Sequence, residues 1–224
     1  MNKILLILLL FGGTISANDD PFEEVNRVIF DFNQSLDGAI FEPIAKSYKE
    51  NLPASVQNRV SNFSSNIGDV STLGNELVQF ELVGGAKTLG RVLLNSTVGL
   101  LGLFDVASEI GLEKSNEDFG QTMAVWGAPK GAYVVLPLVG PSTLRDTVGR
   151  VADSSVRVQQ TQSLTTAQKV GITTTEAVNT RVRLLPVTDL LKESDDPYTL
   201  VRSAYLQKRQ FDIHNGELPE EDEF

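Results

Sequence analysis

The apolar residues that follow Pro21 recur at intervals of three and four, the spacing that places side chains on one face of an α-helix. Asp20 is expected to cap this helix, with Pro21 at its first position, and Gly38 is expected to end it. The sequence therefore predicts an amphipathic helix at the start of the chain. Its apolar stripe consists of Phe22, Val25, Ile29, Phe32 and Leu36.

Further helical segments are expected along the chain, which makes the fold class mainly α. In the first half they begin at Pro43, near Pro53 and near Leu73, with Gly68 and Gly84-Gly85 ending the last two. In the second half, residues 154–180 favour a solvent-facing or loosely packed helix. A last helix is expected to begin at a capping Asp196 and to run to Phe211.

The middle of the chain contains three long uncharged stretches. Thirteen residues, 92–104, lie between Arg91 and Asp105, and stretches of eleven and fourteen follow on either side of Lys130. A helix needs roughly 20 predominantly apolar residues to span a bilayer, so none of these stretches crosses a membrane alone. The mature chain is expected to have no transmembrane helix.

The last uncharged stretch, 131–141, is punctuated by glycine and proline. Pro137 would break a helix there, which indicates an apolar hairpin or loop. A buried pair of core strands would show the same pattern. Both interpretations stay open, because periodicity does not distinguish them.

The first residues have the layout of a secretory signal peptide. Lys3 precedes an unbroken apolar run, 4–11, and small residues follow. We expect residues 1–17 to be removed after Ala17, and a retained N-terminal anchor is the alternative.

The 224 residues contain no cysteine, so disulfides, thiolate metal sites and a lipid on an N-terminal cysteine are excluded.

The charge is strongly acidic. There are 19 Lys and Arg residues against 29 Asp and Glu residues, a net charge of -10. This balance argues against a nucleic-acid-binding protein and against attraction to anionic membranes by charge alone. The main domain is expected at 18–211, and 212–224 is expected to be an acidic, disordered tail.

Catalysis is poorly supported by the residues present. His214 is the sole histidine, and no Gly-x-Ser-x-Gly elbow accompanies it. The acidic pairs Glu117-Asp118 and Asp195-Asp196 stand where helices begin, so we interpret them as capping groups rather than as acid–base or metal sites. The sequence predicts no enzyme, no metal and no cofactor.

A series of short motifs resembles the MlaA (VacJ) family in order and spacing, from Asp20 to Phe211. The motifs are Asp20-Pro21-Phe22-Glu23, Asn26-Arg27, Phe32-Asn33, Leu36-Asp37, Asn62-Phe63, Asn66-Ile67, Asn95-Ser96, Gly99 to Gly102, Asp105-Val106-Ala107, Glu117 to Thr122, Trp126-Gly127, Tyr133 to Pro137, Gly140-Pro141-Ser142, Arg145-Asp146, Asp196-Pro197-Tyr198, Arg202, Ala204-Tyr205 and Lys208-Arg209.

The resemblance implies a ring of short amphipathic helices embedded in one leaflet of the outer membrane, at its periplasmic face. The ring would surround a polar channel that removes mislocalised phospholipid from the outer leaflet and passes it to a periplasmic carrier of the Mla type. Trimeric outer-membrane porins are the implied partners. Family members are typically tethered through a lipidated cysteine, which this sequence lacks. A scaffold that binds porins without moving lipid and a periplasmic lipid hydrolase are the alternatives.

Candidate site residues follow from this picture. Asn33, Arg145 and Asp146 are headgroup-side candidates, although Asn33 is also suited to helix packing and Arg145 to a structural pair with Asp146. The lipid path and its hairpin gate are assigned to Gly127, Gly131, Tyr133, Leu136, Pro137, Gly140 and Pro141.

Overall fold

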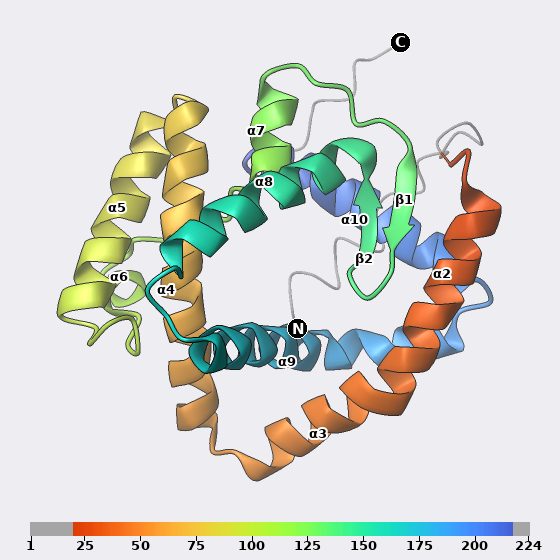
Figure 1. The fold of residues 1–224 in the computed structure, drawn as a ribbon, viewed down its shortest axis with the longest axis horizontal. Helices are drawn as coiled ribbons and strands as arrows, with labels where there is room; N and C mark the ends of the chain where they lie inside the picture. The colour runs from red at the N-terminus through yellow and green to blue at the C-terminus, as the bar shows by residue number, and fades with distance from the viewer. Residues whose placement is uncertain (1–19, 217–224) are drawn as a thin grey trace.

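The computed structural model describes residues 20–216 as helices that follow one another around a ring, closed by a small β-hairpin (Figure 1). The signal peptide expected at 1–17 and the acidic residues from 217 onward lie outside the described part. The elements are α2 (Glu23–Leu36), η2 (Asp37–Phe41), α3 (Glu42–Asn51), α4 (Ala54–Val78), α5 (Leu82–Thr97), α6 (Val106–Glu109), α7 (Phe119–Val125), β1 (Tyr133–Leu136), β2 (Gly140–Thr143), α8 (Leu144–Gln160), α9 (Thr166–Glu193) and α10 (Pro197–Ile213).

The ring has two sides joined by long helices. Helices α2 and α3 form one side, and the α4–α5 pair forms the other (Figure 1). Helix α8 runs from the hairpin towards α4, and α9 returns from α4 towards α2. Among residues 20–216, no helix combines the length and hydropathy that crossing a bilayer requires. The mainly helical fold class is confirmed, but α4 and α9 have 25 and 28 residues and are not short.

The first helix begins and ends differently from the prediction. Gly38 does not end it, because the backbone stays helical through the π-helical turn η2 into α3. Asp20 is not its cap either. The Asp20 carboxylate is buried and accepts hydrogen bonds from Asn26 Nδ2 at 2.8 Å and from the Tyr198 hydroxyl. The Asp20 carboxylate thus bonds a side chain of α10 instead of the backbone amides at the start of α2. A local sequence pattern does not reveal such a distant partner.

Two glycine stops were also predicted wrongly. Helix α4 continues through Gly68 to Val78, and Gly84-Gly85 lies inside α5. The chain instead reverses at Phe80, which has φ +63°. A helical glycine costs about 1 kcal/mol relative to alanine, and packing between two helices offsets that cost. A Cβ on Gly84 would lie 3.0 Å from Glu76 Oε1, so glycine at this position leaves room for the buried Glu76 side chain of α4.

Residues 154–180 form two helices rather than one. Helix α8 ends at Gln160, and α9 begins after Thr165, whose side chain and Gln168 form a capping box. Most side chains of this stretch are exposed or half-buried, as expected. The Thr165–Gln168 spacing was the available signal for the helix start.

The hairpin has a buried half and an exposed half. Strand β1 pairs antiparallel with β2, with Tyr133 opposite Thr143 and Leu136 opposite Gly140. Tyr133 and Val135 are buried against Phe30 and Tyr198, whereas Leu138 in the turn is 66% exposed. Both interpretations of the sequence are thus partly right: the strands belong to the core, and the turn is an exposed apolar tip.

The interior of the described residues is polar and the surface is apolar. Only six apolar residues are buried, against 22 polar or charged ones. In the α4–α5 pair, for example, Arg91 is 1% exposed and bonds Asp69 at 3.3 Å and Asp105 at 3.1 Å. The outer faces of the same helices carry exposed Leu77, Leu82, Val83, Leu89 and Leu93. This is the reverse of the usual distribution in water.

Helices α7 and α8 cross where two glycines meet. A Cβ on Gly149 would overlap the Gly120 backbone nitrogen and lie 2.7 Å from the Gly120 Cα. Gly149→Ala is therefore expected to lower the free energy of unfolding by about 1–3 kcal/mol, measured by urea denaturation in detergent. Gly171→Ala in α9 is the control, because its Cβ meets nothing within 4 Å. Equal stability of the two variants would contradict this packing.

Candidate functional site

Two asparagines of α2 hold the edge of the hairpin. Asn26 donates to the Tyr133 carbonyl at 3.1 Å and accepts from the Val135 amide at 2.8 Å. Asn33 donates to the Leu136 carbonyl at 3.0 Å and accepts from the Leu138 amide at 2.8 Å. The two side chains are seven residues apart, which places them on one face of the helix. Helix α2 therefore satisfies backbone groups of β1 that would otherwise be unpaired.

The predicted gate residues are largely brought together. Tyr133, Leu136, Pro137, Gly140 and Pro141 lie in the hairpin itself. Gly140, at φ +93°, supplies the left-handed backbone after the turn.

Two predicted glycines lie before the hairpin. Gly131 has φ +67°, and a Cβ there would lie 3.0 Å from Leu144 Cβ. Gly127 lies apart, at φ +86° just after α7.

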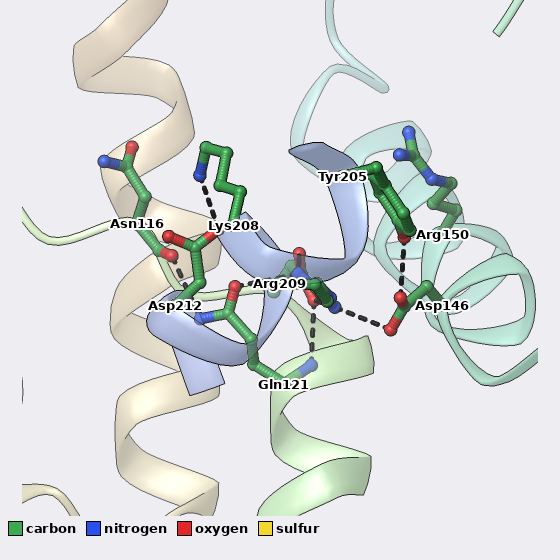
Figure 2. A pocket seen from close by; sticks show the side chains of 9 residues that line it. Asn116, Gln121, Asp146, Arg150, Tyr205, Lys208, Arg209 and Asp212 are labelled. Carbon is green, nitrogen blue, oxygen red and sulfur yellow. Dashed lines mark hydrogen bonds and ion pairs between the residues drawn. The ribbon is translucent and has the colours of Figure 1, made fainter. Parts of the chain in front are cut away.

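A polar cavity of about 280 Å³ lies beside the hairpin, between α7, α8 and α10 (Figure 2). Figure 2 shows Arg209 of α10 reaching towards Asp146 of α8, with Tyr205 bonded to the same carboxylate. Cationic and anionic side chains both face this space. The lining residues are Asn116, Asp118, Gln121, Asp146, Arg150, Tyr205, Lys208, Arg209 and Asp212.

Arg209 organises the charges of this cavity. Its guanidinium bonds both oxygens of Asp118 at 2.6 Å and Asp146 Oδ1 at 2.8 Å, and all three groups meet at the N-terminus of α7. Burial lowers the pKa of Arg209, but the hydrogen bonds and the attraction of the two carboxylates outweigh burial and raise it. Burial raises the pKa of Asp146, and bonds from Arg209 and Tyr205 bring it below the ordinary value.

A second buried polar cluster adjoins the first. Gln79, the C-cap residue of α4, donates to Glu117 Oε2 at 2.9 Å and to the Thr122 hydroxyl at 3.0 Å. Burial raises the pKa of Glu117, although the bond from Gln79 opposes it. Burial likewise raises the pKa of Asp153, which accepts from the Phe119 amide at 3.0 Å. These contacts tie α7 to α4 and α8, so they fix one wall of the cavity.

The three headgroup-side candidates have different positions. Asp146 lines the cavity. Arg145 does not, since its guanidinium bonds the Ala128 carbonyl at 3.3 Å and Asp146 at 3.4 Å. Asn33 is engaged by the hairpin turn. Sequence reasoning did not assign roles to Asn26 or Arg209, although the Asn26–Asn33 spacing was a signal for the first.

Three residues considered for catalysis have structural partners. Asp118 accepts from the Gln121 amide at 2.9 Å and Asp196 from the Thr199 amide at 3.2 Å, which confirms both as helix caps. His214 follows α10, with Nδ1 2.8 Å from the Gln210 carbonyl oxygen. Within residues 20–216, no group of three or more His, Cys, Asp or Glu side chains converges as metal ligands would.

Replacing Asn33 is expected to loosen the hairpin turn. Asn33→Ala removes both bonds to the turn, so the Leu138 amide should exchange its hydrogen faster and stability should fall by about 1 kcal/mol. Hydrogen exchange with mass spectrometry of the hairpin checks this. Gln34→Ala, one position along on the exposed face of α2, is the matched control. Unchanged exchange at the turn in Asn33→Ala would contradict the role assigned to Asn33.

Comparisons with known proteins identify the family. The profile of the family described as MlaA lipoprotein matches residues 18–212. The intermembrane phospholipid transport system lipoprotein MlaA of Escherichia coli is 35% identical over 219 residues, 94% of this chain and 86% of that protein. The protein of the same name from Haemophilus influenzae is 29% identical over 93% of this chain and 85% of its own length.

A solved structure agrees with these relatives. It is described as the structural basis for maintenance of bacterial outer membrane lipid asymmetry, and it matches with a TM-score of 0.75 and 33% identity. The match covers 87% of this chain and 98% of that one. The relatives' names describe a transport lipoprotein and not an enzyme, in agreement with the sequence. The chain belongs to the MlaA lipoprotein family.

Proposed function

We propose that this protein is the outer-membrane component of an Mla system and carries out intermembrane phospholipid transport. It removes mislocalised phospholipid from the outer leaflet and so maintains the lipid asymmetry of the outer membrane. Relatives 35% identical are named for this transport system, and the solved structure concerns this asymmetry. A component of the system lifts lipid out of a bilayer, and the polarity of the fold suits that task.

The reversed polarity of the fold is the observation that carries the proposal. Buried Arg91, Asp69 and Glu76 lie inside the α4–α5 pair, while leucines and valines cover its outside. In hydrocarbon, ionisable side chains are costly unless they face the protein interior, and apolar side chains face lipid freely. None of the helices described has an apolar stretch long enough to cross the bilayer, which suits a location within one leaflet. We place the ring of helices in the periplasmic leaflet of the outer membrane.

The hairpin is suited to gate the lipid path. Its strands are anchored by Asn26 and Asn33, while Leu138 and Val139 at the tip stay exposed. Release of the bond between the Leu138 amide and Asn33 would free the turn to move while the core pair of Tyr133 and Val135 stays in place. Gly131 and Gly140 supply the bends that such a movement needs.

The polar cavity is suited to a zwitterionic headgroup. Arg150 has no carboxylate partner at ion-pair distance among the described residues and is available to a phosphate. Asp118 and Asp212 lie in the same lining, where they pair with Arg209 and Lys208, so an ammonium group would bind by displacing the exposed Lys208 from Asp212. In this scheme Asp146 orients Arg209, and Arg145 supports Asp146 from behind the lining.

Attachment to the membrane and partners complete the proposal. Because these 224 residues contain no cysteine, apolar surface rather than a lipidated cysteine is proposed to hold the protein in the leaflet. A periplasmic carrier of the Mla type would receive the lipid, and a trimeric porin would lie against the ring. The proposal also includes the domain limits: residues 1–17 are a signal peptide that is removed, 18–211 form the transport domain, and 212–224 are an acidic tail.

Cells that lack the gene test the transport role. We expect phospholipid to accumulate in the outer leaflet, and we expect the wild-type gene to restore the barrier. A deletion of Val134–Val139 removes the gate and should not restore it. A membrane-bound protein whose loss leaves surface phospholipid unchanged would instead support the alternative of a scaffold that binds porins without moving lipid.

A further inference from the structure

A second cavity, of about 570 Å³, lies between α4, α9 and the turns beside them. The lining from α4 includes Val60, Phe63 and Ile67, and Ile172 faces them from α9. None of its lining residues is charged, in contrast to the cavity beside the hairpin. The complete lining is Val60, Phe63, Ser64, Ile67, Leu103, Thr161, Leu164, Gln168, Gly171, Ile172 and Thr175.

An arginine adjoins this cavity. Arg59 precedes Val60 of the lining and Phe104 follows Leu103, and the Arg59 guanidinium lies 3.8 Å from the centre of the Phe104 ring. Stacking on an aromatic ring orients a guanidinium without neutralising it. Arg59 forms no ion pair with a carboxylate within residues 20–216. A cation held in place therefore stands one residue along the chain from the lining residue Val60, and its aromatic partner one residue from the lining residue Leu103.

We propose that this cavity binds the acyl chain of a lipid whose anionic group is held by Arg59. The proposal rests on the lipid-handling function proposed above and names a binding site within it. The volume lies in the range of roughly 300–1,000 Å³ that is typical of small-molecule sites. The uncharged lining suits the methylene groups of an acyl chain. The hydroxyls of Ser64, Thr161 and Thr175 can form hydrogen bonds to nearby backbone groups, so they do not require a polar ligand.

The chemistry of the two cavities points to different parts of a lipid. The cavity at α7, α8 and α10 is lined by six charged residues, whereas that at α4 and α9 is lined by none. A chain bound at α4 and α9 is thus anchored at a place distinct from the hairpin. The shared chemistry of the ligand, an acyl chain with an anionic end, is found in fatty acids and in acidic phospholipids.

Gly171 allows the cavity to be filled from its own wall. Gly171 lines the cavity, and a Cβ at this helical position meets nothing within 4 Å, so the first atom of a larger side chain has room there. Gly171→Phe is the filling variant, and Gly171→Ala is the matched control that keeps the space. Arg59→Gln tests the anionic group while it keeps most of the length of the side chain.

The purified mature protein in detergent is mixed with two probes, a diazirine-labelled fatty acid and a diazirine-labelled phosphatidylglycerol. Cross-linked peptides are located by mass spectrometry. We expect labelling of 60–67 and 168–175, at least about tenfold weaker in Gly171→Phe and unchanged in Gly171→Ala. Arg59→Gln should weaken labelling roughly tenfold for both probes but not for a diazirine-labelled fatty alcohol.

The two probes separate the possible sources of the chain. Labelling by the fatty acid alone assigns the site to free fatty acid, and labelling by both assigns it to lipid chains in general. Equal labelling of wild type and Gly171→Phe would overturn the proposal. If Gly171→Phe also restores the barrier in cells that lack the gene, the transport function stands without this site. Failure of wild type to restore it would refute transport instead.

Discussion

Replacing Arg209 by leucine is expected to lower the free energy of unfolding by about 3 kcal/mol, because the substitution removes the closer of the two cations that pair with the buried Asp146 carboxylate and leaves only Arg145, at 3.4 Å, among the described residues. Asp146 has 3% of its side chain exposed, whereas Asp118 has 44%. Most of the loss is therefore expected to come from Asp146. Urea denaturation in detergent, followed by the fluorescence of Trp126 at the end of α7, measures it.

The neighbouring Lys208 supplies the control for the Arg209 variant. Its side chain is 73% exposed and, among residues 20–216, pairs with Asp212 alone, at 2.5 Å, so Lys208→Leu is expected to change stability by no more than about 0.5 kcal/mol. Arg209→Lys keeps the charge and should recover part of the loss. Similar stabilities for Arg209→Leu and Lys208→Leu would show that the buried pair contributes little.

The effect of Arg209→Leu should also depend on pH. In the wild type the pKa of Asp146 is lowered, so its contribution is present above the ordinary carboxyl value and is lost as pH falls through the folded value. Without Arg209, burial dominates and the Asp146 pKa should rise. As pH falls, protonation of Asp146 then removes the buried charge that destabilises the variant. We expect the difference in stability between wild type and variant to be larger at pH 7 than near pH 4.

Sequence patterns predicted those elements of the fold that are determined by interactions between residues close together in the chain. The stripe from Phe22 to Leu36 predicted the helix α2 but not its buried face, which carries Asn26 and Phe30, and Asp196 caps α10 as its position indicated. The Gly131–Pro141 punctuation predicted the hairpin. In each case the determining contacts lie within a few residues of one another. The family resemblance added the transport role, which no local pattern contained.

Contacts between distant segments were not predictable in the same way. Arg209 and Asp146 are 63 residues apart, and Asp20 meets Tyr198 across 178 residues. The glycines Gly68 and Gly84 remain in helices because α4 and α5 pack against each other, so their stop signals were overruled. Buried charges such as Arg91 could not be distinguished from exposed ones, because in this fold polarity does not indicate the outer face.

Two charges on the outer face of α5 are expected to detach the protein from membranes. Leu89 and Leu93 are 46% and 56% exposed and one helical turn apart. Leu89→Glu combined with Leu93→Lys places Glu four residues before Lys, a pair that supports a helix in water. In hydrocarbon each charge costs roughly 2.5–3.5 kcal/mol. Binding to phospholipid vesicles should therefore fall by a factor on the order of 10⁴–10⁵, while helicity in detergent is kept.

The matched control for this double variant lies on α9. Thr173→Glu with Ala177→Lys introduces the same pair, with the same spacing, at two exposed positions where no apolar stripe is lost. Vesicle flotation compares the two double variants, and circular dichroism checks that both remain helical. Loss of flotation in the α5 variant alone is the expected result. If both variants float like the wild type, the α5 leucines do not face lipid, and their exposure must be explained by a protein partner that covers them.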